Sequence, residues 1–208
     1  DPKSEKQVIK GESNKGVTEL VNTGEILTTT LKDSFTDVDI YEEECRLLQF
    51  PFKSPIANSA ISFYRYYLQD TLFIEQDKVV DVEFLPNNQQ DFGFSGRLYI
   101  LLDPDSTFQV RRVELTIPRR SDVNFVENML ISQDFTQLES GDRIASTNDM
   151  LVELQLSKWL GKFQVQRVTR LTNVSFEEIP RSLFKHIKGN TLREPDASMQ
   201  DDSFWNEY

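Results

Sequence analysis

The side chains that most often perform catalysis are scarce in this sequence, which contains a single histidine and a single cysteine. His186 lies in the mixed segment 183–189, where a surface imidazole is expected. Cys45 follows Glu43 and Glu44, and neighbouring carboxylates raise a thiol pKa, so an activated nucleophile is disfavoured. A zinc peptidase built here would need mainly carboxylate ligands, which is unusual for zinc. The sequence therefore predicts a protein that is not an enzyme and has no metal site and no cofactor.

Carboxylates leave one catalytic alternative open. Two converging, unpaired carboxylates in a pocket would support a hydrolase, and the candidates are Asp81, Glu83, Asp103 and Asp105. The segment 103–106 could also bind calcium through clustered oxygens, but it is more typical of a hairpin turn whose aspartates accept backbone hydrogen bonds. The acidic run at 42–44 indicates a solvated surface.

Two further segments have a functional and a structural interpretation. The aromatic side chains Phe63, Tyr64, Tyr66 and Tyr67 could stack on a sugar or a base, although packing in a β-strand is favoured. The segment 93–96 looks like a phosphate-binding turn, but it lacks the lysine and the following helix of a P-loop. It is expected to open a strand in which Gly96 allows a bend or bulge.

The overall composition restricts the class of protein. The chain has 208 residues and a formal net charge of -11, from 23 Lys and Arg against 34 Asp and Glu. A dedicated nucleic-acid binder needs a basic face, so nucleic acid is not expected as a partner. A chain of this length can bury a core without a disulfide or a metal. No apolar stretch is long enough to span a bilayer as a helix.

From about residue 66 to 178 the sequence alternates apolar and polar residues with the period of a half-buried strand. In two clear runs, Val80 and Val82 alternate with acidic residues, and Met150 and Val152 alternate with Leu151 and Glu153. Short polar turns leave no room for helical crossovers, so we predict an antiparallel meander of about seven strands. At 111–112 the apolar residues change from even-numbered to odd-numbered positions, which a β-bulge would explain.

One helix is predicted near 15–28, where apolar residues recur at helical spacing. An antiparallel sheet with one apolar face must cover that face, and this helix is the cover that the sequence offers. We therefore predict an α+β fold in which a curled, half-barrel meander holds the N-terminal helix on its concave face. The residues expected to line the concavity, for which plain core packing is the alternative, are Val82, Phe84, Leu98, Ile100, Met129, Ile131, Val152 and Leu154.

The chain is predicted to have three parts: a flexible lead-in at 1–13, one β-rich domain at 14–178, and an extension or linker at 179–208. Six strings within it are distinctive when taken together: DVDIY at 37–41, FKSP at 52–55, ISFYRYYLQDT at 61–71, FLP at 84–86, FGFSGRLYI at 92–100 and NFVENM at 124–129. In this order they resemble an uncharacterised Bacteroidota family of outer-membrane proteins. Its members carry a carboxypeptidase-regulatory-like domain, then this region, then a β-barrel.

The resemblance implies an internal, periplasmic piece of a longer outer-membrane protein, and it supplies no catalytic residues. The strand and turn rhythm also resembles periplasmic lipoprotein carriers, in which a curved sheet wraps a helix. The leading hypothesis is a non-enzymatic module of envelope transport or biogenesis that binds a lipid, an acyl chain or a partner segment in its concavity. Its other partners would be the neighbouring domains of the same polypeptide, including the barrel. A purely structural scaffold and a carboxylate hydrolase are the alternatives.

Overall fold

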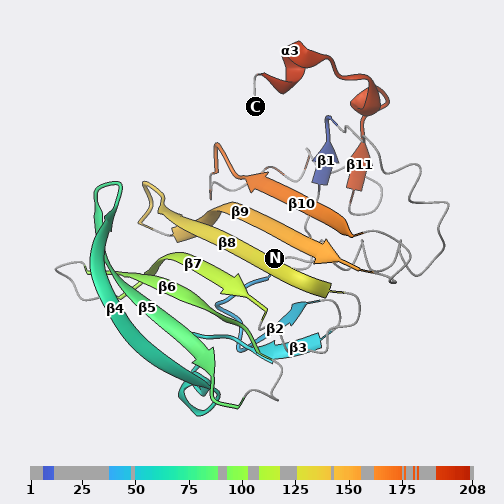
Figure 1. The fold of residues 1–208 in the computed structure, drawn as a ribbon. Helices are drawn as coiled ribbons and strands as arrows, with labels where there is room; N and C mark the ends of the chain where they lie inside the picture. Colours follow the sequence, from blue (N-terminus) through green and yellow to red (C-terminus); the bar gives the residue numbers. More distant parts are fainter. Residues whose placement is uncertain are drawn as a thin grey trace. The chain divides into compact units, whose positions relative to one another are not determined.

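The computed structural model describes residues 7–11, 38–47, 50–88, 93–102, 108–117, 126–141, 143–155, 162–174, 176, 180, 182 and 191–206. The chain divides into two compact units. The larger unit spans 26–174, and the smaller one combines 1–25 with 175–208. Figure 1 shows the elements of both units.

A seven-stranded antiparallel sheet forms most of the larger unit. Its strands are β4 (Tyr64–Ile74), β5 (Asp77–Pro86), β6 (Ser95–Leu101), β7 (Val110–Thr116), β8 (Val126–Gln137), β9 (Arg143–Leu154) and β10 (Phe163–Arg170). Each strand pairs with the next in the sequence, as the short polar turns predict. The sheet is open, with β4 at one edge and β10 at the other.

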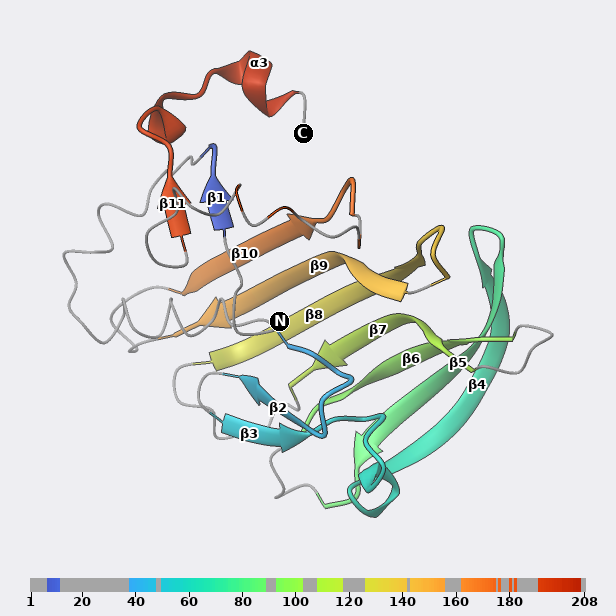
Figure 2. The ribbon, with the colours of Figure 1, turned by 180° about the vertical axis from the view of Figure 1, so that it is seen from behind.

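One face of this sheet is packed against the segment 38–63 (Figures 1 and 2). That segment contains the hairpin of β2 (Glu44–Leu47) and β3 (Phe50–Lys53), followed by the short 3-10 helix η1 (Ala60–Ser62). Its buried side chains join those of the sheet in one cluster; they are Val38, Ile40, Cys45, Phe52 and Ala60. The ring of Phe52 packs edge-on against that of Phe94. We call this the covered face of the sheet.

The predicted α+β class is therefore wrong. The protein is mostly β, no N-terminal helix packs on the described sheet, and the sheet does not close. The helix expected at 15–28 lies outside the described residues. The physical reason is that a sheet needs apolar side chains over its face, whatever their backbone conformation. The proline-containing segment 38–63, with its short hairpin and 3-10 helix, supplies them here, and its Ile40 and Phe52 are almost fully buried.

Bulges set which side chains reach the covered face. Arg111 is an extra residue in β7, because Tyr99 pairs with Arg112 while Ile100 pairs with Val110. This confirms the bulge predicted from the parity flip at 111–112. A second bulge, which the sequence pattern did not reveal, leaves Gln69 of β4 without a partner in β5. Since each extra residue reverses the alternation, the side chains beyond it change faces.

Gly96 of β6 shows why a side chain is excluded at one point of the core. Its neighbours across the sheet are Phe84 of β5 and Leu115 of β7. A Cβ atom at Gly96 would collide with the backbone carbonyl oxygen of Glu114 and lie 3.1 Å from the ring of Phe84. The glycine thus makes room for the Phe84 ring, which is fully buried.

The smaller unit joins residues from the two ends of the chain. It contains β1 (Gln7–Ile9), which pairs in parallel with β11 (Thr191–Arg193), the 3-10 helix η3 (Ala197–Met199) and the helical turn α3 (Asp202–Trp205). The amide of Gln200 donates to the Lys10 carbonyl oxygen at 2.8 Å. A Cβ at Gly11 would meet the ring of Phe204. Parts of the predicted lead-in and extension therefore fold together.

Candidate binding surface

The structure brings all eight predicted lining residues together on the covered face. Six of them are buried in the core: Phe84, Leu98, Met129, Ile131, Val152 and Leu154. Val82 and Ile100 are partly buried and pack against that core. The segment 38–63 thus fills much of the space that the sequence analysis assigned to a concavity. Val82 and Ile100 mark the border where the cover ends.

Beyond that border the covered face continues as an apolar surface that we call the apolar strip, consisting of Leu68, Phe73, Val80, Val82, Ile100 and Leu102. The register places these side chains together, since Leu68 pairs with Val82 and Val80 pairs with Ile100. At the far end, Phe73 pairs with Lys78, whose carbonyl accepts from the Leu102 amide at 2.9 Å. Leu68 is 74% exposed and Phe73 is 66% exposed. Exposed side chains of this kind on adjoining strands are typical of an interaction site.

The Gln69 bulge creates this strip. Leu68 and Phe73 are five positions apart, so regular alternation would put them on opposite faces of the sheet. The extra residue restores them to one face and sends Leu72 to the other. There Leu72 packs in a small cluster with Ile74, Val79 and Leu101. The bulge therefore divides the apolar residues of β4 between a buried cluster and an exposed surface.

The strip lies beside the open edge of the sheet. β4 is an edge strand of 11 residues, and its side chains from Tyr67 to Thr71 are all exposed. Edge strands present unpaired backbone donors and acceptors. One of them is occupied locally, because the amide of Thr71 donates to the Oδ1 atom of Asp70 at 2.7 Å. Asp70 itself pairs with Asp81 across to β5.

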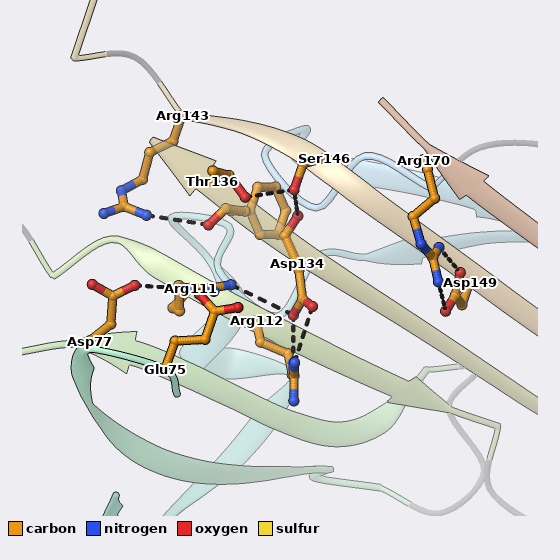
Figure 3. A network of polar contacts seen from close by, with 11 residues as sticks. Glu75, Asp77, Arg111, Arg112, Asp134, Thr136, Arg143, Ser146, Asp149 and Arg170 are labelled. Atoms are coloured by element: carbon orange, nitrogen blue, oxygen red, sulfur yellow. Dashed lines mark hydrogen bonds and ion pairs between the residues drawn. The ribbon is translucent and has the colours of Figure 1, made fainter. Parts of the chain in front are cut away.

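An arginine clamp fixes the hairpin that carries the strip (Figure 3). The guanidinium of Arg111, the bulge residue of β7, donates to Asp77 Oδ2 at 2.8 Å and to Glu75 Oε2 at 3.1 Å. Its side chain is only 7% exposed, and Asp134 Oδ1 lies 3.8 Å from its third nitrogen. Glu75 occupies the turn with a φ of 55°, a conformation that costs energy for a residue other than glycine. The clamp therefore holds a strained turn against β7.

The opposite face of the sheet, which we call the charged face, carries a row of ion pairs beside the small apolar cluster of Leu72, Ile74, Val79 and Leu101. Arg97 donates to Asp81 at 2.8 Å, and Arg112 and Arg170 form bidentate pairs with Asp134 and Asp149. Such a ladder fits a solvated face of an antiparallel sheet. These ion pairs also disfavour a catalytic role for the three carboxylates, because an arginine holds each of them in place.

Two of the carboxylates considered for a hydrolase lie on the charged face. Asp81 is bonded to Arg97, and Glu83 accepts from the amide of Gln69 at 2.6 Å. Asp103 and Asp105 lie outside the described residues, as does His186. Within the described ranges, no group of three His, Cys, Asp or Glu side chains could hold a metal ion. The described residues thus do not bring together two unpaired carboxylates from this candidate set.

The thiol of Cys45 is buried beneath the sheet and donates to the Asp39 carbonyl oxygen at 3.0 Å. Burial, followed by the nearby Asp39 carboxylate, raises the pKa of Cys45 to about 12. The thiol is therefore protonated and enclosed at neutral pH. The direction of the pKa shift agrees with the prediction, but its main cause is burial rather than the adjacent Glu43 and Glu44.

The aromatic stretch at 63–67 divides between two environments. Tyr64 and Tyr66 pack at the edge of the core, and their hydroxyl groups donate to the carbonyl oxygens of Lys53 and Pro55. Burial raises the pKa of both phenols, to about 12 for Tyr66. Phe63 and Tyr67 are 42% and 44% exposed. Core packing thus accounts for two of the four rings.

Sequence reasoning did not single out Leu68, Phe73 or Leu102 as functional. It followed the strict alternation of the central strands, whereas Leu68 and Phe73 lie on either side of a bulge and Leu102 follows the end of β6. The polar pair 69–70 within an otherwise apolar and aromatic run is the signal that could have shown the bulge.

The fold and the surface together define an open antiparallel sheet covered on one face, with an exposed apolar strip at one edge. The chain belongs to a family of unknown function (DUF5686), whose model matches residues 14–173. This confirms the uncharacterised family in general terms, while the organism group, the envelope location and the neighbouring domains stay predictions. No curated protein and no solved structure matches the chain. In the described part of the chain, no helix has the length and hydropathy to cross a membrane.

Proposed function

We propose that this chain is a non-enzymatic, periplasmic module of a Bacteroidota outer-membrane protein that binds a partner polypeptide segment on its apolar strip. The observation that carries the proposal is the exposure of Leu68 and Phe73 beside the partly buried Val82 and Ile100. This surface adjoins the covered face, because Val82 and Ile100 also pack against the core. A partner segment would cover the exposed side chains of the strip, as the segment 38–63 covers the rest of this face.

A polypeptide segment suits this surface better than a lipid or an acyl chain. The space over Phe84, Leu98 and Ile131 is already filled, so an acyl chain would gain only a shallow strip beside solvent. Lys78 interrupts the strip between Phe73 and Leu102, and its ammonium group needs water or a polar partner. A polypeptide can supply both apolar side chains and polar groups along one extended surface.

The test is selection of binding peptides from a displayed random library by the full 208-residue chain. Burying the exposed parts of Leu68 and Phe73 should contribute about 1–2 kcal/mol each, so a Leu68→Ser/Phe73→Ser double variant should weaken binding by about tenfold or more. Val168→Ser is the matched control, because Val168 is 54% exposed on β10 at the other edge. It should bind as the unchanged chain does.

Two outcomes contradict the proposal. If no peptide is enriched, or if binding is insensitive to the double variant, the strip is not a binding surface and a scaffold function is favoured. If enriched peptides are cleaved, and cleavage is lost in Asp81→Ala or Glu83→Ala, the carboxylate hydrolase replaces it.

A further inference from the structure

The geometry points to the outer edge of β4 as the acceptor for an extended partner strand that carries a basic residue opposite Asp70. This inference rests on the proposed function and names the partner's conformation and charge. The strand would add to the sheet beyond β4 as an eighth member. Its apolar side chains would extend the apolar strip, and its basic side chain would lie on the charged face.

The open edge selects for an extended backbone. In an antiparallel sheet, about every second residue of an edge strand directs its amide and carbonyl groups away from the sheet. β4 offers this row over 11 residues, and no described strand pairs with its outer side. A helix or a lipid leaves these groups to water, whereas an added strand pairs with them. The edge also lacks proline and carries Arg65 and Asp70 as its charged side chains.

Asp70 supplies the charge selection. Its carboxylate is exposed and takes part in no ion pair among the described residues. Asp81 lies directly across from it on β5, and like charges in that position repel. Arg97 compensates Asp81 but not Asp70. A partner strand that buried Asp70 without a cation would leave a desolvated charge, so strands bearing lysine or arginine there are favoured.

The backbone amide of Thr71 makes the pairing of the edge depend on the charge of Asp70. Asp70 now accepts the hydrogen bond from that amide. An incoming ammonium or guanidinium group that attracts the carboxylate would free the amide for the partner's own carbonyl oxygen. A partner with an acidic or apolar residue at this position would have to compete with Asp70 for the same donor. The edge is therefore closed to strands of the wrong charge, a common protection of exposed edges.

A second copy of this chain fits the edge less well. Each chain carries a net charge of -11, so two copies repel at low ionic strength. A basic or neutral partner strand meets no such penalty. The charge balance thus commits the inference to a different polypeptide rather than to self-association.

The probes are short peptides fused to a monomeric fluorescent carrier, with valine and threonine alternating and lysine, glutamate or threonine at the central threonine position. Binding to the full chain is measured by fluorescence anisotropy. A single cross-strand charge contact changes affinity modestly, so we expect the lysine peptide to bind about fivefold tighter than the glutamate peptide. In Asp70→Lys the order should reverse, and in Asp70→Asn the preference should disappear.

Glu139→Lys is the matched control, because Glu139 is an exposed acid in the β8–β9 turn and the change alters net charge as Asp70→Lys does. It should leave the preference for the lysine peptide intact. If Glu139→Lys reverses the order as well, the effect is general charge steering and the inference is wrong. An unchanged preference in Asp70→Lys, or no binding by any of the three peptides, also overturns it.

Amide hydrogen exchange separates this inference from the proposed function. An added strand should protect alternate amides of β4 between Arg65 and Phe73. Peptides that lose binding in Leu68→Ser/Phe73→Ser but leave the β4 amides unprotected would support the apolar strip and refute the added strand. If library-selected peptides protect the β4 amides but show no preference for lysine that depends on Asp70, the charge selection is refuted while the added strand is supported.

Discussion

Replacing Phe84 by alanine tests whether the covered face is packed as the structure shows. Phe84 is fully buried in β5, and its ring centroid lies 5.4 Å from that of Tyr64 and 6.5 Å from that of Tyr66. Deleting a buried phenylalanine side chain costs about 3–5 kcal/mol in free energy of unfolding. The value depends on how far the neighbours can collapse into the cavity.

The neighbours of Phe84 have little freedom to move, so we expect about 4–5 kcal/mol. Gly96 lies beside the ring and has no side chain with which to fill the space. The hydroxyl groups of Tyr64 and Tyr66 are held by the carbonyl oxygens of Lys53 and Pro55. Their rings therefore cannot swing into the cavity without breaking a hydrogen bond.

The measurement is urea unfolding followed by circular dichroism, with Leu85→Ala as the control. Leu85 is the next residue, points to the other face and is 38% exposed, so its loss should cost less than about 1.5 kcal/mol. If Phe84→Ala cost less than about 1 kcal/mol, or no more than Leu85→Ala, the assigned faces of β5 would be reversed. Should Phe84→Ala prevent folding altogether, Phe84→Leu provides a smaller and measurable loss.

The remaining predictions concern titrating groups. Because burial raises the pKa of Cys45 to about 12, a disulfide reagent should not modify the folded chain near neutral pH but should react once denaturant is added; rapid reaction without denaturant would contradict the enclosed position. Burial also raises the pKa of Tyr66 to about 12 from 10.0, so its contribution to stability is complete below pH 10.0 and is lost as the pH rises towards about 12. Urea unfolding across this range should show a smaller alkaline loss in Tyr66→Phe, and equal losses in both proteins would refute the assignment.

The alternation of apolar and polar residues was sufficient to predict the antiparallel meander. A half-buried strand requires period-two alternation, and short polar turns permit only neighbouring antiparallel pairs. Even the Arg111 bulge could be predicted, because the apolar residues on both sides of it are buried and their parity visibly changes. The grouping of Val82, Phe84, Leu98 and Ile131 on one face follows from the same pattern.

What covers that face was decided only by tertiary packing. Helical periodicity near 15–28 favoured a helix there, but the described cover is the segment 38–63. Its Ile40 and Phe52 show no recurring spacing, because Ile40 lies in a turn and Phe52 in a strand of four residues, which is too short to establish a period.

The apolar strip also required the three-dimensional structure. The Gln69 bulge turns Leu68 and Phe73 to one face, and a register shift between exposed residues leaves little trace in hydrophobic periodicity. The pairing of β1 with β11 joins residues almost the whole chain apart. Local sequence carries no information on which distant partner satisfies a strand's backbone, so the contacts that define the edge and the two units could come only from the folded chain.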